Sequence, residues 1–161
     1  MKKSRVYNFS AGPGMLPLPV LQRAQAELVN LPGMGMSILE ISHRSAPFKH
    51  VLRDTQNNLR TLLDLPRDYR ILFLQGGATL QFSMVPMNLL RGSGRQADYV
   101  VAGTWGKKAV TEARREGEGR VLWGGEEEAF IRMPRPDEWK PDPEAAYVHI
   151  TSNETIQGLQ M

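Results

Sequence analysis

The chain has 161 residues, of which 41% are hydrophobic and 23% are charged, a composition typical of one folded domain that excludes a disordered or collagen-like chain. Twenty lysines and arginines against 17 aspartates and glutamates give a net charge of +3, and because the basic residues are scattered we expect no nucleic acid as a partner. The chain has no cysteine, which excludes disulfides and cysteine-bound metal and is consistent with a cytoplasmic location. The sequence contains no apolar run long enough to cross a membrane, so we expect no membrane partner.

Prolines and glycines are frequent between Asn8 and Pro19, and this density favours extended chain over helix. We therefore expect the chain to begin with an arm. Apolar residues then recur at helical spacing from Pro19 to Asn30, which predicts a short amphipathic helix. A second helix is predicted to begin near Ser45, a residue favoured at helix N-caps, and to end before Leu65 and Pro66.

From Tyr69 onward, short apolar runs alternate with helical patterns, as in an α/β fold with a mainly parallel sheet flanked by helices. The predicted strands are Arg70 to Leu74, Asp98 to Ala102, Arg120 to Trp123 and Tyr147 to Thr151. The predicted helices between them are Thr79 to Leu90 and Lys107 to Glu116. Pro86 lies inside the first of these helices and should kink or split it, because proline lacks the backbone N–H donor.

A glycine-rich segment, residues 75–79 (Gln-Gly-Gly-Ala-Thr), follows the first predicted strand and opens a helix. Small residues at a helix N-terminus let backbone N–H groups approach an anion, so this segment is a candidate phosphate cradle. A tight strand-to-helix turn that uses glycine only for its shape explains the same residues. The spacing matches neither a dinucleotide fingerprint nor a nucleoside-triphosphate loop.

Two further segments follow predicted strands and should reach the same edge of a parallel sheet, where ligands commonly bind. Trp105, within residues 103–106, offers a flat ring that could stack on a ligand, or it could anchor a core or an interface. Residues 152–155 (Ser-Asn-Glu-Thr) could present a hydroxyl or an amide to a ligand, or simply cap a turn.

His43 and Arg44 lie between a glycine-rich break and the second predicted helix. A guanidinium offers a planar pair of donors to a phosphate or carboxylate, and an imidazole adds a titratable donor. A solvated pair in a loop is the alternative. The three histidines of the chain show no metal-ligand spacing, so we expect no metal site.

Five motifs in register give the chain a resemblance to the phosphoserine aminotransferase family, pyridoxal-phosphate enzymes of the class V aminotransferases. The motifs are NFSAGPGMLP at Asn8 to Pro17, SILEISHRS at Ser37 to Ser45, FLQGGATLQFSMVPMNLL at Phe73 to Leu90, ADYVVAGTW at Ala97 to Trp105 and SNETIQG at Ser152 to Gly158. The resemblance implies the large domain of a fold-type I transferase. It also implies an N-terminal arm over residues 1–18, directed towards the active site and small domain, and an incomplete large domain over residues 19–161.

The activity that the resemblance implies is transamination between O-phospho-L-serine and 2-oxoglutarate, which gives 3-phosphooxypyruvate and L-glutamate in serine biosynthesis. In many bacteria the family also serves pyridoxine (vitamin B6) biosynthesis. The implied cofactor is pyridoxal 5′-phosphate, and the implied assembly of the full-length enzyme is a homodimer.

Carried over by position, the backbone at Ala78 and Thr79 should hold the cofactor phosphate, and Trp105 should stack on the pyridine ring. Thr155 should hydrogen-bond the cofactor near its ring oxygen. His43 and Arg44 should take the distal phosphate or carboxylate of the substrate.

The family's catalytic lysine, which holds the cofactor as a Schiff base, belongs to a segment beyond Met161, so we expect no catalytic residue in this chain and no activity from it alone. Transamination needs that amine to shuttle a proton. A non-catalytic fragment that binds pyridoxal phosphate or another phosphate, and another class V aminotransferase, are the alternatives.

Overall fold

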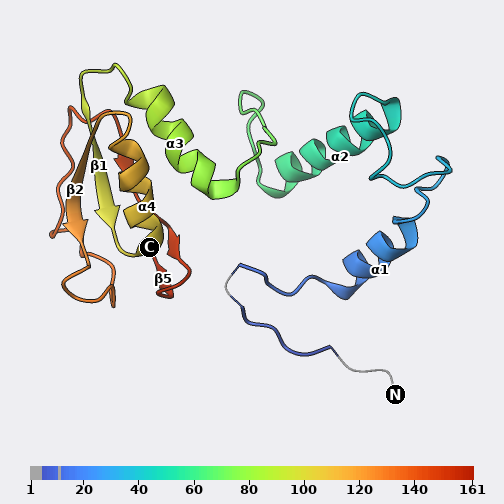
Figure 1. The fold of residues 1–161 in the computed structure, drawn as a ribbon, viewed down its shortest axis with the longest axis horizontal. Helices are drawn as coiled ribbons and strands as arrows, with labels where there is room; N and C mark the ends of the chain where they lie inside the picture. The colour runs from blue at the N-terminus through green and yellow to red at the C-terminus, as the bar shows by residue number, and fades with distance from the viewer. Residues whose placement is uncertain (1–4, 11) are drawn as a thin grey trace. The chain divides into compact units, whose positions relative to one another are not determined.

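The computed structural model describes residues 5–10 and 12–161, which divide into two compact units at the junction of Phe73 and Leu74 (Figure 1). The predicted arm, residues 1–18, falls in the first unit. Its residues 1–4 and 11 lie outside the described part of the chain.

The first unit contains two helices, α1 (Leu18–Glu27) and α2 (Ala46–Leu62). Both were predicted, although α1 ends three residues earlier than the apolar pattern indicates. The hydroxyl of Ser45 accepts a hydrogen bond from the backbone N–H of Phe48, which confirms Ser45 as the N-cap of α2. None of the described apolar side chains of this unit is buried.

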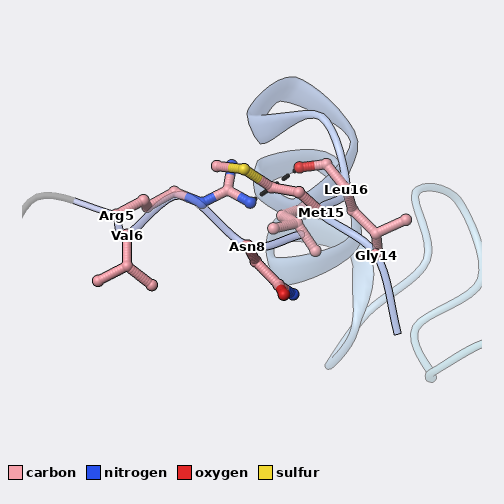
Figure 2. Close-up of a pocket in the computed structure, with 7 residues that line it drawn as sticks. Arg5, Val6, Asn8, Gly14, Met15 and Leu16 are labelled. Carbon is pink, nitrogen blue, oxygen red and sulfur yellow. Dashed lines mark hydrogen bonds between the residues drawn. The ribbon is translucent and has the colours of Figure 1, made fainter. Parts of the chain in front are cut away.

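Described residues of the arm form hydrogen bonds with one another before α1 begins. A guanidinium N–H of Arg5 donates to the carbonyl of Leu16 over 2.9 Å, as Figure 2 shows. The side-chain amide of Asn8 donates to the carbonyl of Pro13 over 2.8 Å. These contacts form one side of a shallow groove of about 410 Å³ that reaches Leu21 on α1. Both hydrogen bonds lie within the described residues of the arm.

The prediction of a strand from Arg70 to Leu74 is wrong, because these residues belong to no helix or strand and pair with no described strand. Side chains of α2 donate hydrogen bonds to backbone carbonyl oxygens in this segment and just before it. Gln56 donates to the carbonyl of Ile71, and Arg60 donates to the carbonyl of Tyr69. A strand requires a partner ladder, and the apolar pattern alone does not supply one.

The second unit is an α/β layer with a short hairpin attached (Figure 1). Its elements are α3 (Gly77–Leu89), β1 (Gln96–Val101), α4 (Thr104–Ala113), β2 (Glu118–Gly124), β3 (Val148–His149), β4 (Asn153–Glu154) and β5 (Leu159–Gln160). The three-stranded sheet has the order β2-β1-β3 with all strands parallel. This confirms the mainly parallel sheet, whereas the antiparallel hairpin β4–β5 was not predicted.

The core of the second unit lies between β1 and α4. Residues at alternate positions of β1 pack against α4 and the end of α3, in a cluster made of Leu90, Ala97, Tyr99, Val101, Ala109, Val110 and Ala113. Asp98 is fully buried and forms two hydrogen bonds with Arg120, its cross-strand partner in β2, at 2.8 and 2.9 Å. The central strand is thus fixed by apolar packing and by an ion pair.

Pro86 does not split α3, contrary to one of the two outcomes expected from the sequence. The ring is buried, and the carbonyl of Pro86 accepts hydrogen bonds from the N–H groups of Leu90 and Arg91 at 2.9 Å each. Proline removes one donor from the helix ladder, but the packing of α3 on α4 maintains the remaining turns.

Candidate functional site

A cleft of about 400 Å³ lies where β1 and β3 end and α3 and α4 begin. The residues that line it are Ala78, Phe82, Trp105, His149, Ile150, Thr151, Ser152, Asn153 and Thr155. Three residues predicted to bind a ligand, Ala78, Trp105 and Thr155, therefore meet in one cleft. They are far apart in sequence. Trp105 and Thr155 come after β1 and β3, parallel strands whose carboxyl ends lie at one edge of the sheet. Ala78 lies in the first turn of α3, which packs against α4.

The start of α3 has the features of an anion site. Gly76 is the N-cap with φ of 88°, and a Cβ at this position would come within 2.5 Å of the Leu80 side chain, so only glycine fits. The helix has no side-chain cap. The first-turn N–H groups of Gly77, Ala78 and Thr79 belong to the positions that an α-helix leaves without internal acceptors. Together with the helix dipole, these donors favour a negative group at Ala78.

The structure separates the side chain of Thr79 from the other predicted residues. Thr79 lines a neighbouring cleft of about 480 Å³ together with Thr104, Lys107 and Lys108. Its backbone N–H nevertheless belongs to the same helical turn as that of Ala78. The prediction for Thr79 concerned its backbone, and it stays a prediction.

Trp105 and Thr155 contact each other directly. The indole N–H of Trp105 donates to the hydroxyl of Thr155 over 2.9 Å. The ammonium of Lys108 lies 4.5 Å from the centroid of the Trp105 ring, a cation–π contact that covers one face of the indole. Because the Thr155 oxygen accepts from Trp105, the hydroxyl proton remains available to a ligand.

Sequence reasoning missed Glu154, which lies between two of the lining residues and is fully buried. Its carboxylate accepts hydrogen bonds from the backbone N–H groups of Trp105 at 2.8 Å and Gly106 at 2.7 Å. The available signal was an acidic residue within the polar segment 152–155, together with a helix start that has glycines at positions 103 and 106. That signal does not reveal the contact, because it spans about fifty residues of chain.

His149 lines the cleft and packs against aromatic residues. Its ring stacks on Tyr99 with centroids 5.0 Å apart and lies edge-on to Phe82 at 5.9 Å. One ring nitrogen is 3.3 Å from the hydroxyl of Thr151. Burial lowers the pKa of His149 below its ordinary value because the charged form loses hydration. The imidazole that lines the cleft is therefore uncharged at pH 7.

His43 and Arg44 belong to the first unit, where both side chains are exposed. The backbone N–H of Arg44 donates to the hydroxyl of Ser42 over 3.2 Å, which shapes the turn before α2. Their predicted role in substrate binding stays a prediction.

No described helix has the length and apolar character needed to cross a membrane. Among residues 5–10 and 12–161, no group of three or more histidine, aspartate or glutamate side chains is arranged to hold a metal ion.

The fold and the cleft define an α/β protein with a candidate small-molecule site at the carboxyl edge of a parallel sheet, beside an uncapped helix N-terminus. A family model described as Aminotransferase class-V matches residues 6–161. The chain belongs to the class V aminotransferase family.

Individual relatives agree with this assignment. The phosphoserine aminotransferase of Laribacter hongkongensis is 54% identical over 155 residues, which cover 96% of this chain and 43% of the relative. That of Rhodopirellula baltica is 51% identical over 156 residues, covering 97% of this chain and 42% of the relative. The chain thus spans less than half the length of these curated relatives.

Solved structures give the same result. The phosphoserine aminotransferase from Bacillus circulans subsp. alkalophilus matches with a TM-score of 0.90 and 47% identity, over 98% of this chain and 43% of that chain. A pyridoxal-phosphate-bound phosphoserine aminotransferase from Trichomonas vaginalis matches with a TM-score of 0.88 and 42% identity, over 97% of this chain and 46% of that chain. The sheet and helices of the chain accordingly belong to the fold of these enzymes.

Proposed function

We propose that the cleft lined by Ala78, Trp105 and Thr155 binds pyridoxal 5′-phosphate in an enzyme that transfers the amino group of O-phospho-L-serine to 2-oxoglutarate. The observation that carries the proposal is the meeting of these three residues in one cleft. The names of the relatives support the substrate, and the cofactor in the Trichomonas vaginalis structure supports the ligand. When bound, the cofactor would supply an electron sink for the amino acid's α-carbon.

The residues that are present fit such a ligand. The cleft volume of about 400 Å³ lies within the usual range of small-molecule sites, roughly 300–1,000 Å³. The start of α3 offers N–H donors and a positive dipole to a phosphate, through the backbone of Ala78 and Thr79. The Thr155 hydroxyl oxygen accepts a hydrogen bond from the Trp105 indole N–H, so its own proton is available to donate to an oxygen on the ligand's ring.

Trp105 would stack on the ring with the indole face that does not carry Lys108. The ammonium on the opposite face holds the indole in place. A ring stacked on Trp105 would also lie beside the neutral imidazole of His149, which lines the same cleft. These groups bind and orient the ligand and exclude water from one side of it.

His43 and Arg44 are proposed to bind the distal phosphate of the amino acid, or the distal carboxylate of 2-oxoglutarate. The guanidinium can donate two parallel hydrogen bonds to either group. Among the described residues, neither Arg44 nor His43 forms an ion pair. Their side chains are exposed, so both groups are accessible to an anionic substrate.

No lysine lines the cleft in the described part of the chain. Lys107 pairs with Glu126 at 2.6 Å, and Lys108 lies over Trp105. We therefore propose that these 161 residues bind the cofactor non-covalently and do not by themselves complete amino transfer. A homodimeric assembly, a cytoplasmic location and a second role in pyridoxine biosynthesis are proposed on the family resemblance.

The test measures glutamate formed from O-phospho-L-serine and 2-oxoglutarate by the natural gene product that contains these residues. The expected result is turnover that depends on pyridoxal phosphate and falls when Arg44 is replaced by alanine, mainly through a higher KM for phosphoserine. Faster turnover of an unphosphorylated amino donor would overturn the proposed substrate.

A chimera provides a second test, with this chain in place of the matching residues of the Laribacter hongkongensis relative. The unaltered relative is the control for expression, folding and assay. An active chimera supports the proposal. A folded chimera that binds no pyridoxal phosphate overturns it.

A further inference from the structure

Two helices, α3 and α4, begin near the cleft, and their N-termini differ in the hydrogen-bond partners of their first backbone N–H groups. The start of α3 has no side-chain cap. At α4 the carboxylate of Glu154 accepts from the N–H groups of the second and third helical residues, Trp105 and Gly106, at 2.8 and 2.7 Å. This is the pairing that an N-cap side chain normally makes from the adjacent position, but here it comes from β4.

The contact depends on close approach between the hairpin and the helix. A Cβ on Gly103 would lie 2.7 Å from the Glu154 carboxyl carbon, and a Cβ on Gly106 would lie 3.1 Å from its Oε1 atom. Gln157 of the same hairpin donates to the hydroxyl of Thr104 over 2.8 Å. The hairpin is therefore docked on the first turn of α4 by several directed hydrogen bonds.

The negative charge of Glu154 is balanced by the helix start. The carboxylate is fully buried, and none of the described lysines or arginines forms an ion pair with it. A helix N-terminus carries an effective charge of about +0.5 and offers free N–H donors, which stabilise a buried anion. With Glu154 in place, the start of α4 is already occupied, whereas the start of α3 is open to an external anion.

We propose that Glu154 is a positioning residue with two effects on the cleft. It fixes the backbone of Trp105 relative to Thr155, its own neighbour in sequence, so that the indole and the hydroxyl reach their 2.9 Å contact. It also directs an incoming phosphate to α3 by filling the competing site at α4. The inference rests on the proposed cofactor site, and it assigns no contact between Glu154 and the ligand.

The experiment compares Glu154→Gln with Asp98→Asn in the natural gene product. Both changes replace a fully buried carboxylate by an amide, but Asp98 pairs with Arg120 and does not line the cleft. Two readouts are taken on folded protein: the dissociation constant of pyridoxal phosphate, and the NMR signal of the Trp105 indole N–H, assigned by its loss in Trp105→Phe. The second readout needs no cofactor.

We expect Glu154→Gln to shift the Trp105 indole signal and to weaken cofactor binding by up to about fivefold, the scale of the Trp105 stacking contact itself, because the glutamine amide presents a donor to one of the two N–H groups. Asp98→Asn should leave the Trp105 indole signal at its parent position and the dissociation constant within about twofold of the parent value. Glu154→Asp retains the charge, but its side chain is one methylene shorter. Its indole shift and its dissociation constant should fall between those of the parent and those of Glu154→Gln. It also provides the test if the glutamine variant does not fold.

An unchanged indole signal in both Glu154 variants would overturn the inference. Equal changes in Glu154→Gln and Asp98→Asn would also overturn it, since they would show a general structural effect. Failure of the parent protein to bind pyridoxal phosphate would instead overturn the proposed function, and the indole signal would still decide whether Glu154 positions Trp105.

Discussion

The indole N–H of Trp105 donates a hydrogen bond to the hydroxyl of Thr155 over 2.9 Å, although fifty residues of chain separate them. The bond joins the first turn of α4 to the segment that follows β3 and places a flat ring beside a hydroxyl in one cleft. A heteroaromatic ligand that carries an oxygen substituent on its ring could stack on the indole and accept a hydrogen bond from the hydroxyl at the same time. Under the proposed function, Trp105 would contact the ligand through its ring face and would also orient the Thr155 hydroxyl towards it.

Replacing Trp105 by alanine should weaken binding of pyridoxal phosphate by about 1 kcal/mol, which is the scale of aromatic stacking pairs. Trp105→Phe keeps a ring and removes the N–H donor, so it should lose less affinity. Equilibrium titration of the cofactor measures both changes. Trp123, which lies under Arg132 away from the cleft, provides the control, because Trp123→Phe should leave the affinity unchanged. Equal affinities for the Trp105 variants and the parent would contradict the stacking role.

Alanine usually stabilises a helix by up to about 1 kcal/mol relative to glycine, but at Gly106 we expect the opposite sign. The added Cβ would lie 3.1 Å from the Glu154 carboxylate and 3.2 Å from the Cα of Val101, so the hairpin or the strand must shift. Urea unfolding should show a lower free energy of unfolding for Gly106→Ala. Gly124→Ala is the matched control, because its Cβ would meet only Val121, at 3.6 Å. A more stable Gly106→Ala variant would contradict the close approach of Glu154.

The ion pair between Asp98 and Arg120 should stabilise the sheet. Asp98 is fully buried and accepts two hydrogen bonds from the guanidinium, so Asp98→Asn should lower the free energy of unfolding by about 1.5–3 kcal/mol, the scale of hydrogen bonds to charged groups. The hydrogen bonds from Arg120 lower the pKa of Asp98 from its ordinary 3.8. The contribution is thus complete above that pH and is lost as the pH falls through the lower, folded value. Urea unfolding at several pH values tests this, and an equal acid loss in parent and variant would contradict it.

His149 should make stability depend on pH in a higher window. Burial against Tyr99 and Phe82 lowers its pKa from 6.5. As the pH falls below 6.5 the unfolded chain takes up a proton that the folded chain does not, so stability should fall until the folded pKa is reached. His149→Gln should remove this part of the pH dependence. An identical slope in parent and variant, measured by thermal unfolding between pH 7 and pH 5, would contradict the burial of a neutral imidazole.

Much of the second unit could be predicted from the sequence because its signals are local. The apolar run that became β1 needs only neighbouring residues to be recognised. The same is true of the helical spacing of α4, although α4 begins and ends three residues earlier than the predicted helix from Lys107 to Glu116. The N-cap at Ser45 is equally local. The glycine-rich turn before α3 was recognised for the same reason, since Gly76 has a backbone conformation that other residues rarely adopt.

Features that depend on distant partners could not be predicted in the same way. Residues 70–74 have the composition of a strand, but pairing is a property of two segments. The hairpin β4–β5 consists of two-residue strands and was interpreted only as a polar loop. Glu154 was missed because its acceptors belong to a helix start about fifty residues away.

The most direct test of the cofactor site is a fluorescence titration of this chain with pyridoxine 5′-phosphate, which has the phosphate and the ring but no aldehyde and cannot react with lysine. The chain has three tryptophans, so Trp105→Phe identifies the part of the signal that Trp105 contributes. We predict saturable quenching in the parent chain and its loss in Trp105→Phe. Quenching that does not saturate, or that is equal in both proteins, would contradict a cofactor site at Trp105.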